Sequence, residues 1–214
     1  MYKTVIFDYD FTLGDSAYGI AVSCNYALGK LGFAEKTGEE IRRTIGLSLK
    51  EVFRALTGSD SEETAKRFAE LFRERADEIM TDSAVMYEDA LPTLSEFRAR
   101  GFKTAIVTSK FHYRIDEILR KFSAESLIDE IVGGDDVSRE KPDPEGLLKA
   151  VEALGIDKRE VLYVGDSLVD AKTAQSAGVD FAAVLTGTTT DFSDYDSVFI
   201  ARNLREILHF VTKI

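Results

Sequence analysis

Short apolar runs alternate with amphipathic segments along much of the chain. Four runs are rich in β-branched residues and short enough to be buried strands, and two weaker runs share their character. The four are Thr4–Phe7, Thr104–Val107, Val161–Val164 and Phe181–Leu185, and the weaker two are Ile131–Val132 and Val198–Ile200. The pattern therefore predicts a set of strands that are buried on both faces.

Between these runs, apolar residues recur at helical spacing. Pro144 near the start of one such segment and Gly155 after its end are typical of helix boundaries. The predicted helices are Leu91–Arg100, Tyr113–Phe122, Pro144–Leu154, Leu168–Ala177 and Asn203–Val211. Strands and helices in alternation predict an α/β fold, a doubly wound parallel sheet with right-handed crossovers.

One stretch after the first strand breaks this alternation. It contains no convincing strand and shows helical periodicity throughout, at Ile20–Leu31, Gly38–Ile45, Leu49–Leu56 and Glu62–Met80. We therefore expect an all-α domain of residues 16–81, inserted into an α/β core made of residues 1–15 and 82–214.

Composition narrows the classes of partner. The net charge of −11 argues against non-specific binding to nucleic acid or to an anionic membrane. Cys24 is the only cysteine, so no internal disulfide is possible, and its place in a helical pattern indicates a small core residue. No apolar run is long enough to span a bilayer, so we expect a cytoplasmic protein. We further expect a monomer or a homodimer.

Polar residues follow several of the predicted strands, at the edge where ligands bind in open parallel sheets. These residues are Asp8 and Asp10 after the first strand, Thr108, Ser109 and Lys110 after the second, Lys141 in the loop before the Pro144 helix, and Asp166 and Asp170 after the Val161–Val164 strand. Each alone is unremarkable, since an Asp after a strand is more often a turn residue or a helix cap. Their occurrence together at one edge indicates a functional site.

The residue types at this edge suit one kind of chemistry. Carboxylates brought together raise one another's pKa unless a cation lies among them, and oxygen ligands of this kind suit Mg²⁺. A hydroxyl and a lysine opposite the acids suit a phosphoryl group. One carboxylate is able to attack phosphorus, and a second carboxylate two residues later is able to transfer the proton.

Four segments resemble, in order, the four motifs of the haloacid dehalogenase superfamily of phosphatases. They are "FDYDFTL", "IVTSK", "EKPDPE" and "YVGDSLVDAKTAQSAG". The resemblance implies a Rossmann-like core and makes residues 16–81 the helical C1 cap. It implies that Asp8 is the nucleophile, Asp10 the general acid/base, Thr108 the residue that holds the phosphoryl group, and Lys141 the cation that neutralises nucleophile and phosphate.

The resemblance also implies a Mg²⁺ site. Its ligands would be Asp8, Asp10 through the backbone carbonyl, and Asp166, with Asp170 supporting the metal site. Together the four motifs are specific for the superfamily and weakly specific for the substrate.

Within the superfamily the chain looks most like the phosphoglycolate phosphatase branch, on "DFTLGDS", "TIGLSLKEVF" and "VTSKFHYRIDEIL". This implies hydrolysis of a small phosphomonoester, that is, a small phosphorylated metabolite, with Ser109 among the substrate-binding residues. Gly46, Leu47 and Ser48 are expected to form a loop of the cap that reads the substrate.

Phe11 departs from the family, which usually has glycine at this position. Two interpretations stay open: the ring projects toward the site mouth or the cap interface, where it contacts the substrate, or it only packs under the cap.

Three other functions compete with a phosphatase. A haloacid dehalogenase needs neither the second acid Asp10 nor a metal ligand such as Asp166. A phosphomutase of the β-phosphoglucomutase type shares all four motifs and is separated only by its products. A non-enzymatic phospho-receiver module needs neither a lid nor a general acid.

Overall fold

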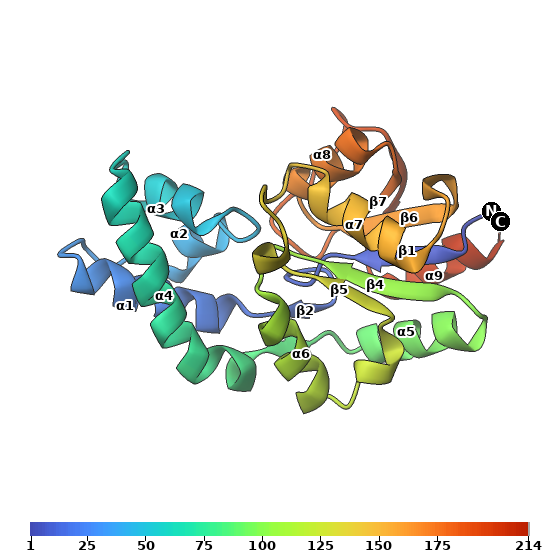
Figure 1. The fold of residues 1–214 in the computed structure, drawn as a ribbon, viewed down its shortest axis with the longest axis horizontal. Coiled ribbons are helices and arrows are strands. Elements are labelled where there is room, and N and C mark those ends of the chain that lie inside the picture. The colour runs from blue at the N-terminus through green and yellow to red at the C-terminus, as the bar shows by residue number, and fades with distance from the viewer. Residues whose placement is uncertain (214) are drawn as a thin grey trace. The chain divides into compact units, whose positions relative to one another are not determined.

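The computed structural model describes residues 1–213, which form two compact units. One unit combines Met1–Gly14 with the chain from Met86 onward, and the other is Asp15–Val85 (Figure 1). The roles of these units as catalytic core and cap stay predictions.

The first unit contains a six-stranded sheet in the order β5-β4-β1-β6-β7-β8. All neighbouring strands in it are parallel. The strands are β1 (Thr4–Phe7), β4 (Lys103–Val107), β5 (Glu130–Val132), β6 (Val161–Gly165), β7 (Asp180–Val184) and β8 (Ser197–Ala201). Each lies within one residue of its predicted bounds, and the predicted α/β fold with a parallel sheet is confirmed.

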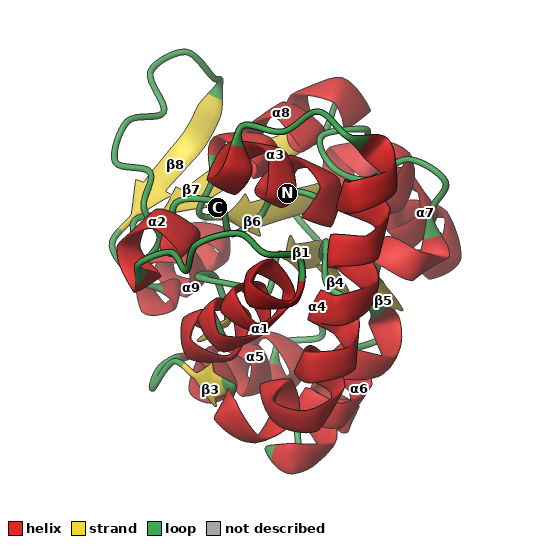
Figure 2. Ribbon diagram, turned by 90° about the vertical axis from the view of Figure 1, so that its left-hand side faces the viewer, coloured by secondary structure: helices red, strands yellow, loops and turns green. Residues whose placement is uncertain are grey.

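Helices cover both faces of this sheet. Figure 1 shows α7 (Glu145–Leu154) and α8 (Leu168–Ala177) on one side, and α5 (Ala90–Ala99), α6 (His112–Lys121) and α9 (Leu204–Lys213) on the other. Three short 3₁₀ turns complete the connections, at Glu125–Leu127, Gly134–Asp136 and Lys158–Glu160. Figure 2 shows β8 at one edge of the sheet, joined to β7 by a long loop.

Alternate residues of the strands face α7 and α8, as the period of two in a strand requires. Ile6, Ala105 and Tyr163 are fully buried there and pack with Leu147 and Ala174 of the two helices. This core fixes the strand ends relative to one another, and those ends hold the candidate site.

The second unit is helical, with α1 (Ala17–Lys30), α2 (Gly38–Arg42), α3 (Leu49–Thr57) and α4 (Glu62–Ser83). Its core holds Cys24, where burial raises the pKa of the thiol to about 12, as expected for a small core residue rather than a reactive one. The rings of Phe33, Phe53 and Phe68 pack in sequence, with 5.5 Å between neighbouring ring centroids.

Two strands escaped prediction. β2 (Gly14–Asp15) and β3 (Val85–Met86) form a separate two-stranded sheet where the chain passes from one unit to the other. Two residues carry no periodicity, so no pattern in the sequence announces them. Among residues 1–213, no helix combines the length and the apolar character needed to cross a bilayer.

Candidate active site

The strand register brings distant parts of the sequence to one edge of the sheet. β1 lies between β4 and β6, and its last residue, Phe7, is aligned with Ile106 and Val164. The chain therefore leaves the sheet at Asp8, beside the ends of β4 and β6. Thr108 follows the end of β4, and Asp166 follows the end of β6. This edge is where open parallel sheets bind ligands.

Three carboxylates meet there. Oxygen atoms of Asp8, Asp166 and Asp170 all lie within 4.8 Å of one another, and the three residues are buried. Burial raises the pKa of Asp8 to about 7, against the opposing charge of Lys141. Burial and the charges of Asp170 and Asp8 raise the pKa of Asp166 to about 9. The three acids outnumber the one ammonium beside them, so a further cation among them would be favourable.

Lys141 is the cation nearest the predicted nucleophile. Its Nζ lies 3.0 Å from Asp8 Oδ1 and donates to Asp170 Oδ1 at 2.7 Å and to the Tyr163 hydroxyl at 3.3 Å. Burial by itself would lower the pKa of this ammonium, but the charges of Asp170 and Asp8 hold it well above its ordinary value. Lys141 is therefore fixed in place and stays charged.

Asp170 holds this arrangement together. Its Oδ1 accepts hydrogen bonds from Lys141 and from the Tyr163 hydroxyl at 2.9 Å. Its Oδ2 accepts from Ser167, from the amide at 3.2 Å and from Oγ at 2.5 Å. Both oxygens are thus engaged, which suits the supporting part predicted for Asp170 better than direct coordination of a metal.

Of the three acids in the cluster, Asp8 and Asp166 keep capacity for a further ligand. Asp8 Oδ1 lies against a single ammonium, Nζ of Lys141 at 3.0 Å, and within residues 1–213 no group donates to the Asp166 carboxylate. Buried polar atoms without partners are rare and call for a ligand. Oxygen-only donors suit Mg²⁺, so the residues present fit the predicted cation.

The Asp10 carboxylate lies outside the three-acid cluster. Its Oδ2 is 3.0 Å from Nζ of Lys110, and both side chains are largely buried. The side chain of Asp10 is therefore held by Lys110 and apart from the three acids, a position that suits the predicted acid or base and leaves the backbone carbonyl as the predicted metal ligand. That backbone contact stays a prediction.

Thr108 and Ser109 follow β4 as predicted. The Thr108 amide donates to the Val132 carbonyl at 3.0 Å, and its Oγ1 accepts from the Lys110 amide at 3.3 Å. A Cβ added to Gly134 would lie 2.6 Å from the Ser109 carbonyl oxygen, so only glycine allows this close approach of the two loops. The hydrogen bond to Val132, the last residue of β5, thus holds the backbone at Thr108 in place.

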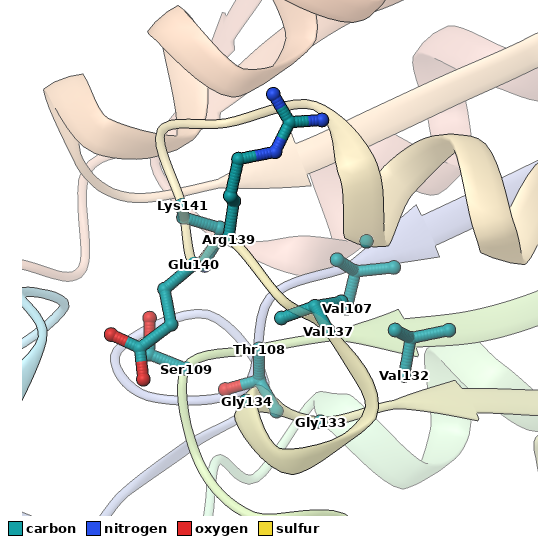
Figure 3. A pocket seen from close by; sticks show the side chains of 11 residues that line it. Val107, Thr108, Ser109, Val132, Gly133, Gly134, Val137, Arg139, Glu140 and Lys141 are labelled. Carbon is teal, nitrogen blue, oxygen red and sulfur yellow. The ribbon is translucent and has the colours of Figure 1, made fainter.

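A cavity of about 10 Å³, room for a single water molecule, adjoins this loop. Figure 3 shows Thr108 and Ser109 on one side of it and the segment from Arg139 to Lys141 on another. A space of this size is too small to enclose a metabolite.

Phe11 adopts a left-handed conformation, with φ of 60°, and is only 2% exposed. Its amide donates to the Gly14 carbonyl at 2.7 Å, and its own carbonyl accepts from Thr186 Oγ1. The positive φ explains why glycine suits this position. The ring is buried, and its predicted contact with a substrate stays a prediction.

The predicted substrate-reading residues belong to the helical unit. Gly46 has φ of 97°, and Leu47 packs against the helical core. Ser48 caps α3: its Oγ accepts from the Glu51 amide at 3.3 Å and donates to the Glu51 carboxylate at 2.8 Å. This hydroxyl already has a structural role, and the contact of the three residues with a substrate stays a prediction.

Sequence reasoning missed three contributors to the site. Lys110 was seen at a strand end, but nothing in the sequence paired it with Asp10. Tyr163 stands in an otherwise aliphatic strand, which is a usable signal, because a buried hydroxyl needs a partner. Gly187 gave no signal, although a Cβ there would lie 1.8 Å from Asp166 Oδ2.

Comparisons with known proteins show which proteins this chain is similar to. A family model for haloacid dehalogenase-like hydrolases matches residues 5–184. A phosphoglycolate phosphatase of Nitrosospira multiformis is 35% identical over 82% of this chain and 80% of its own length. The pyrophosphatase PpaX of Bacillus pumilus is 34% identical over 85% of this chain and 82% of its own.

A solved structure extends the likeness over nearly the whole chain. The crystal structure of a haloacid dehalogenase-like hydrolase from Bacteroides fragilis superposes with a TM-score of 0.94 at 38% identity, covering 97% of this chain and 100% of that one. With the acids, hydroxyl and lysine of the four motifs gathered at one sheet edge, the chain belongs to the haloacid dehalogenase-like hydrolase family and, with these relatives, to its phosphatases.

Proposed function

We propose that this chain hydrolyses a small phosphomonoester with the help of Mg²⁺ and through an aspartyl-phosphate on Asp8. The observation that carries the proposal is the environment of Asp8. Its carboxylate is buried, lies 3.0 Å from a lysine, and has an oxygen within 4.8 Å of oxygens of two further acids. A nucleophile that must meet a phosphoryl group and a cation needs these surroundings.

The residues that would hold the metal are Asp8 and Asp166, with the backbone carbonyl of Asp10 added by the family resemblance. When bound, Mg²⁺ supplies positive charge that offsets the acids and orients the phosphoryl oxygens. Asp170 keeps Lys141 in position beside Asp8.

In the first step an Asp8 oxygen attacks phosphorus, and the bond to the leaving-group oxygen breaks as Asp10 gives that oxygen a proton. In the second step Asp10 takes a proton from a water molecule, whose oxygen attacks the phosphorus of the aspartyl-phosphate. Phosphate leaves and Asp8 is restored. Thr108 and Lys141 hold the phosphoryl oxygens through both steps.

The substrate class follows from the relatives. Phosphoglycolate, or a metabolite like it, is the first candidate, and the relative named as a pyrophosphatase makes pyrophosphate the second. The helical unit would close over the bound substrate and exclude water, with Gly46, Leu47 and Ser48 reading its identity. We further propose a cytoplasmic monomer or homodimer.

The test is phosphate release from a panel of phosphorylated metabolites. We expect EDTA to abolish release, Mg²⁺ to restore it and Ca²⁺ to support it poorly. Asp8→Asn should leave no measurable turnover, and Asp10→Asn should lose roughly a hundred- to ten-thousand-fold. Asp60→Asn, on the surface of the helical unit, is the control.

Full activity in EDTA would contradict the metal assignment. More than a few per cent of activity in Asp8→Asn would favour direct attack by water. Conversion of a sugar phosphate into its isomer, without release of phosphate, would identify a phosphomutase instead.

A further inference from the structure

A second buried lysine lies beside the predicted acid/base rather than beside the nucleophile. Nζ of Lys110 is 3.0 Å from Asp10 Oδ2, and the lysine side chain is 7% exposed. The same ammonium lies 5.8 Å from the centroid of the Tyr9 ring, within the range of a cation–π contact. The carboxylate and the ring together hold the charge in one place.

The two lysines of the site differ in what they contact. Lys141 is engaged by Asp8, Asp170 and the Tyr163 hydroxyl, all fixed groups of the protein. Within residues 1–213, the ammonium of Lys110 contacts one carboxylate and one ring face. An ammonium has three hydrogens, so Lys110 retains hydrogen-bonding capacity that Lys141 has already used.

The position of Asp10 defines which part of a substrate lies near Lys110. If Asp10 protonates the leaving-group oxygen, that oxygen lies about 2.6–3.2 Å from it. A negative group one or two bonds beyond the oxygen is then within reach of an ammonium that is 3.0 Å from the same carboxylate. Lys141 is tied to the nucleophile, on the side of the phosphoryl group that is transferred.

The geometry points to a subsite for an anionic leaving group, with Lys110 as the residue that recognises its charge. This inference rests on the proposed function. It selects phosphate esters or anhydrides whose leaving group carries its own negative charge next to the scissile oxygen. Phosphoglycolate, with a carboxylate, and pyrophosphate, with a second phosphate, share this chemistry.

The experiment compares matched leaving groups. Phosphoglycolate and 2-hydroxyethyl phosphate have similar size, but only the first has a charged leaving group, and pyrophosphate is a third substrate. We expect wild-type kcat/KM to favour phosphoglycolate over 2-hydroxyethyl phosphate by at least about tenfold. Lys110→Met should lower that preference by about tenfold to a hundredfold, the usual range for a lost hydrogen bond to a charged group. Lys110→Arg, which keeps the charge, should retain most of it.

Pyrophosphate distinguishes a carboxylate from a second phosphate as the source of negative charge. If Lys110→Met lowers kcat/KM for pyrophosphate as much as for phosphoglycolate, the subsite recognises negative charge rather than a carboxylate. Lys172→Met, on the exposed surface of α8, is the control. Equal losses for charged and neutral substrates would overturn the inference, because Lys110 would then act only through Asp10. An unchanged preference in Lys110→Met would also overturn the inference. So would a wild type that hydrolyses phosphoglycolate and 2-hydroxyethyl phosphate equally well. If the wild type hydrolyses other members of the metabolite panel but none of these three, the subsite is overturned and the proposed function stands. If it hydrolyses no member of the panel, the proposed function is overturned, and the subsite with it.

Discussion

Phe11 combines two opposing contributions to the stability of the folded chain. Its ring is almost fully buried, and replacing a buried phenylalanine by alanine usually costs about 3–5 kcal/mol. Its φ of 60° disfavours any side chain with a Cβ by roughly 1–2 kcal/mol. Glycine would lose the ring but relieve the backbone.

We therefore predict that Phe11→Gly is more stable than Phe11→Ala by about 1 kcal/mol, measured by chemical denaturation. Phe53 is also buried but lies inside α3, where alanine is normally more stable than glycine. Phe53→Gly should therefore be less stable than Phe53→Ala. The same order at both positions would contradict the strain assigned to Phe11.

At the residue scale, the sequence predicted chemical types better than partners. Asp8, Lys141 and Asp166 meet as expected, because the carboxyl ends of parallel strands share an edge. The use of both Asp170 oxygens depends on Tyr163 and Ser167 lying on particular sides of a strand end. The pairing of Lys110 with Asp10 depends likewise on side-chain directions in two loops, which no periodicity records.

The loop between β7 and β8 contacts two of the four motifs. Thr186 donates from Oγ1 to the Phe11 carbonyl, and Gly187 approaches the carboxylate of Asp166 so closely that a Cβ would lie 1.8 Å from its Oδ2. The loop thus limits where the Asp166 carboxylate is able to lie.

We predict that Gly187→Ala displaces this carboxylate and raises the dissociation constant for Mg²⁺ by at least about tenfold, the scale typical of disturbed support around a metal ligand. Calorimetric titration of Mg²⁺ into the substrate-free protein measures this without relying on turnover. Gly29→Ala is the matched control, since a Cβ there meets nothing within 4 Å. Unaltered Mg²⁺ affinity in Gly187→Ala would contradict the prediction, because the loop would then move to admit the Cβ without displacing the Asp166 carboxylate.

Elements with a clear period were predictable and those without one were not. The helices of the sheet unit lie within two residues of their predicted bounds, because apolar spacing and terminal glycines mark them. In the helical unit α1 begins at Ala17 rather than Ile20, and α4 runs on to Ser83 rather than ending at Met80. The turn added to α4 contains no apolar residue, and the turn added to α1 contains the exposed Tyr18, so neither extends the buried stripe from which a helix is predicted.

At the scale of the whole molecule, the buried acids link stability to pH. The pKa of Asp8 rises from 3.8 to about 7, and that of Asp166 from 3.8 to about 9. A carboxyl group whose pKa is raised on folding contributes its stability below the unfolded value, and that contribution is lost as pH rises through the folded value. The metal-free protein should therefore lose stability between about pH 4 and pH 9.

We predict that the melting temperature of the metal-free chain falls from pH 6 to pH 9, and that saturating Mg²⁺ reduces this fall because the cation takes over from the bound protons. Asp166→Asn should flatten the metal-free profile, which separates the effect of this acid from the general repulsion within a chain of net charge −11. A melting temperature that rises over this range, or an Asp166→Asn profile as steep as that of the wild type, would rule out the linkage.

The central place of β1 in the sheet has a consequence for how the chain is made. Both of its neighbours come much later: β4 begins at Lys103, 96 residues after Phe7, and β6 begins at Val161. On the ribosome, at about 5–20 residues per second, the first strand is exposed for seconds with no edge to pair with. The helical unit is one continuous segment and is complete by Val85, so it is able to fold during that wait. Formation of the acid cluster, which needs residues on both sides of this long interval, marks a late stage of folding.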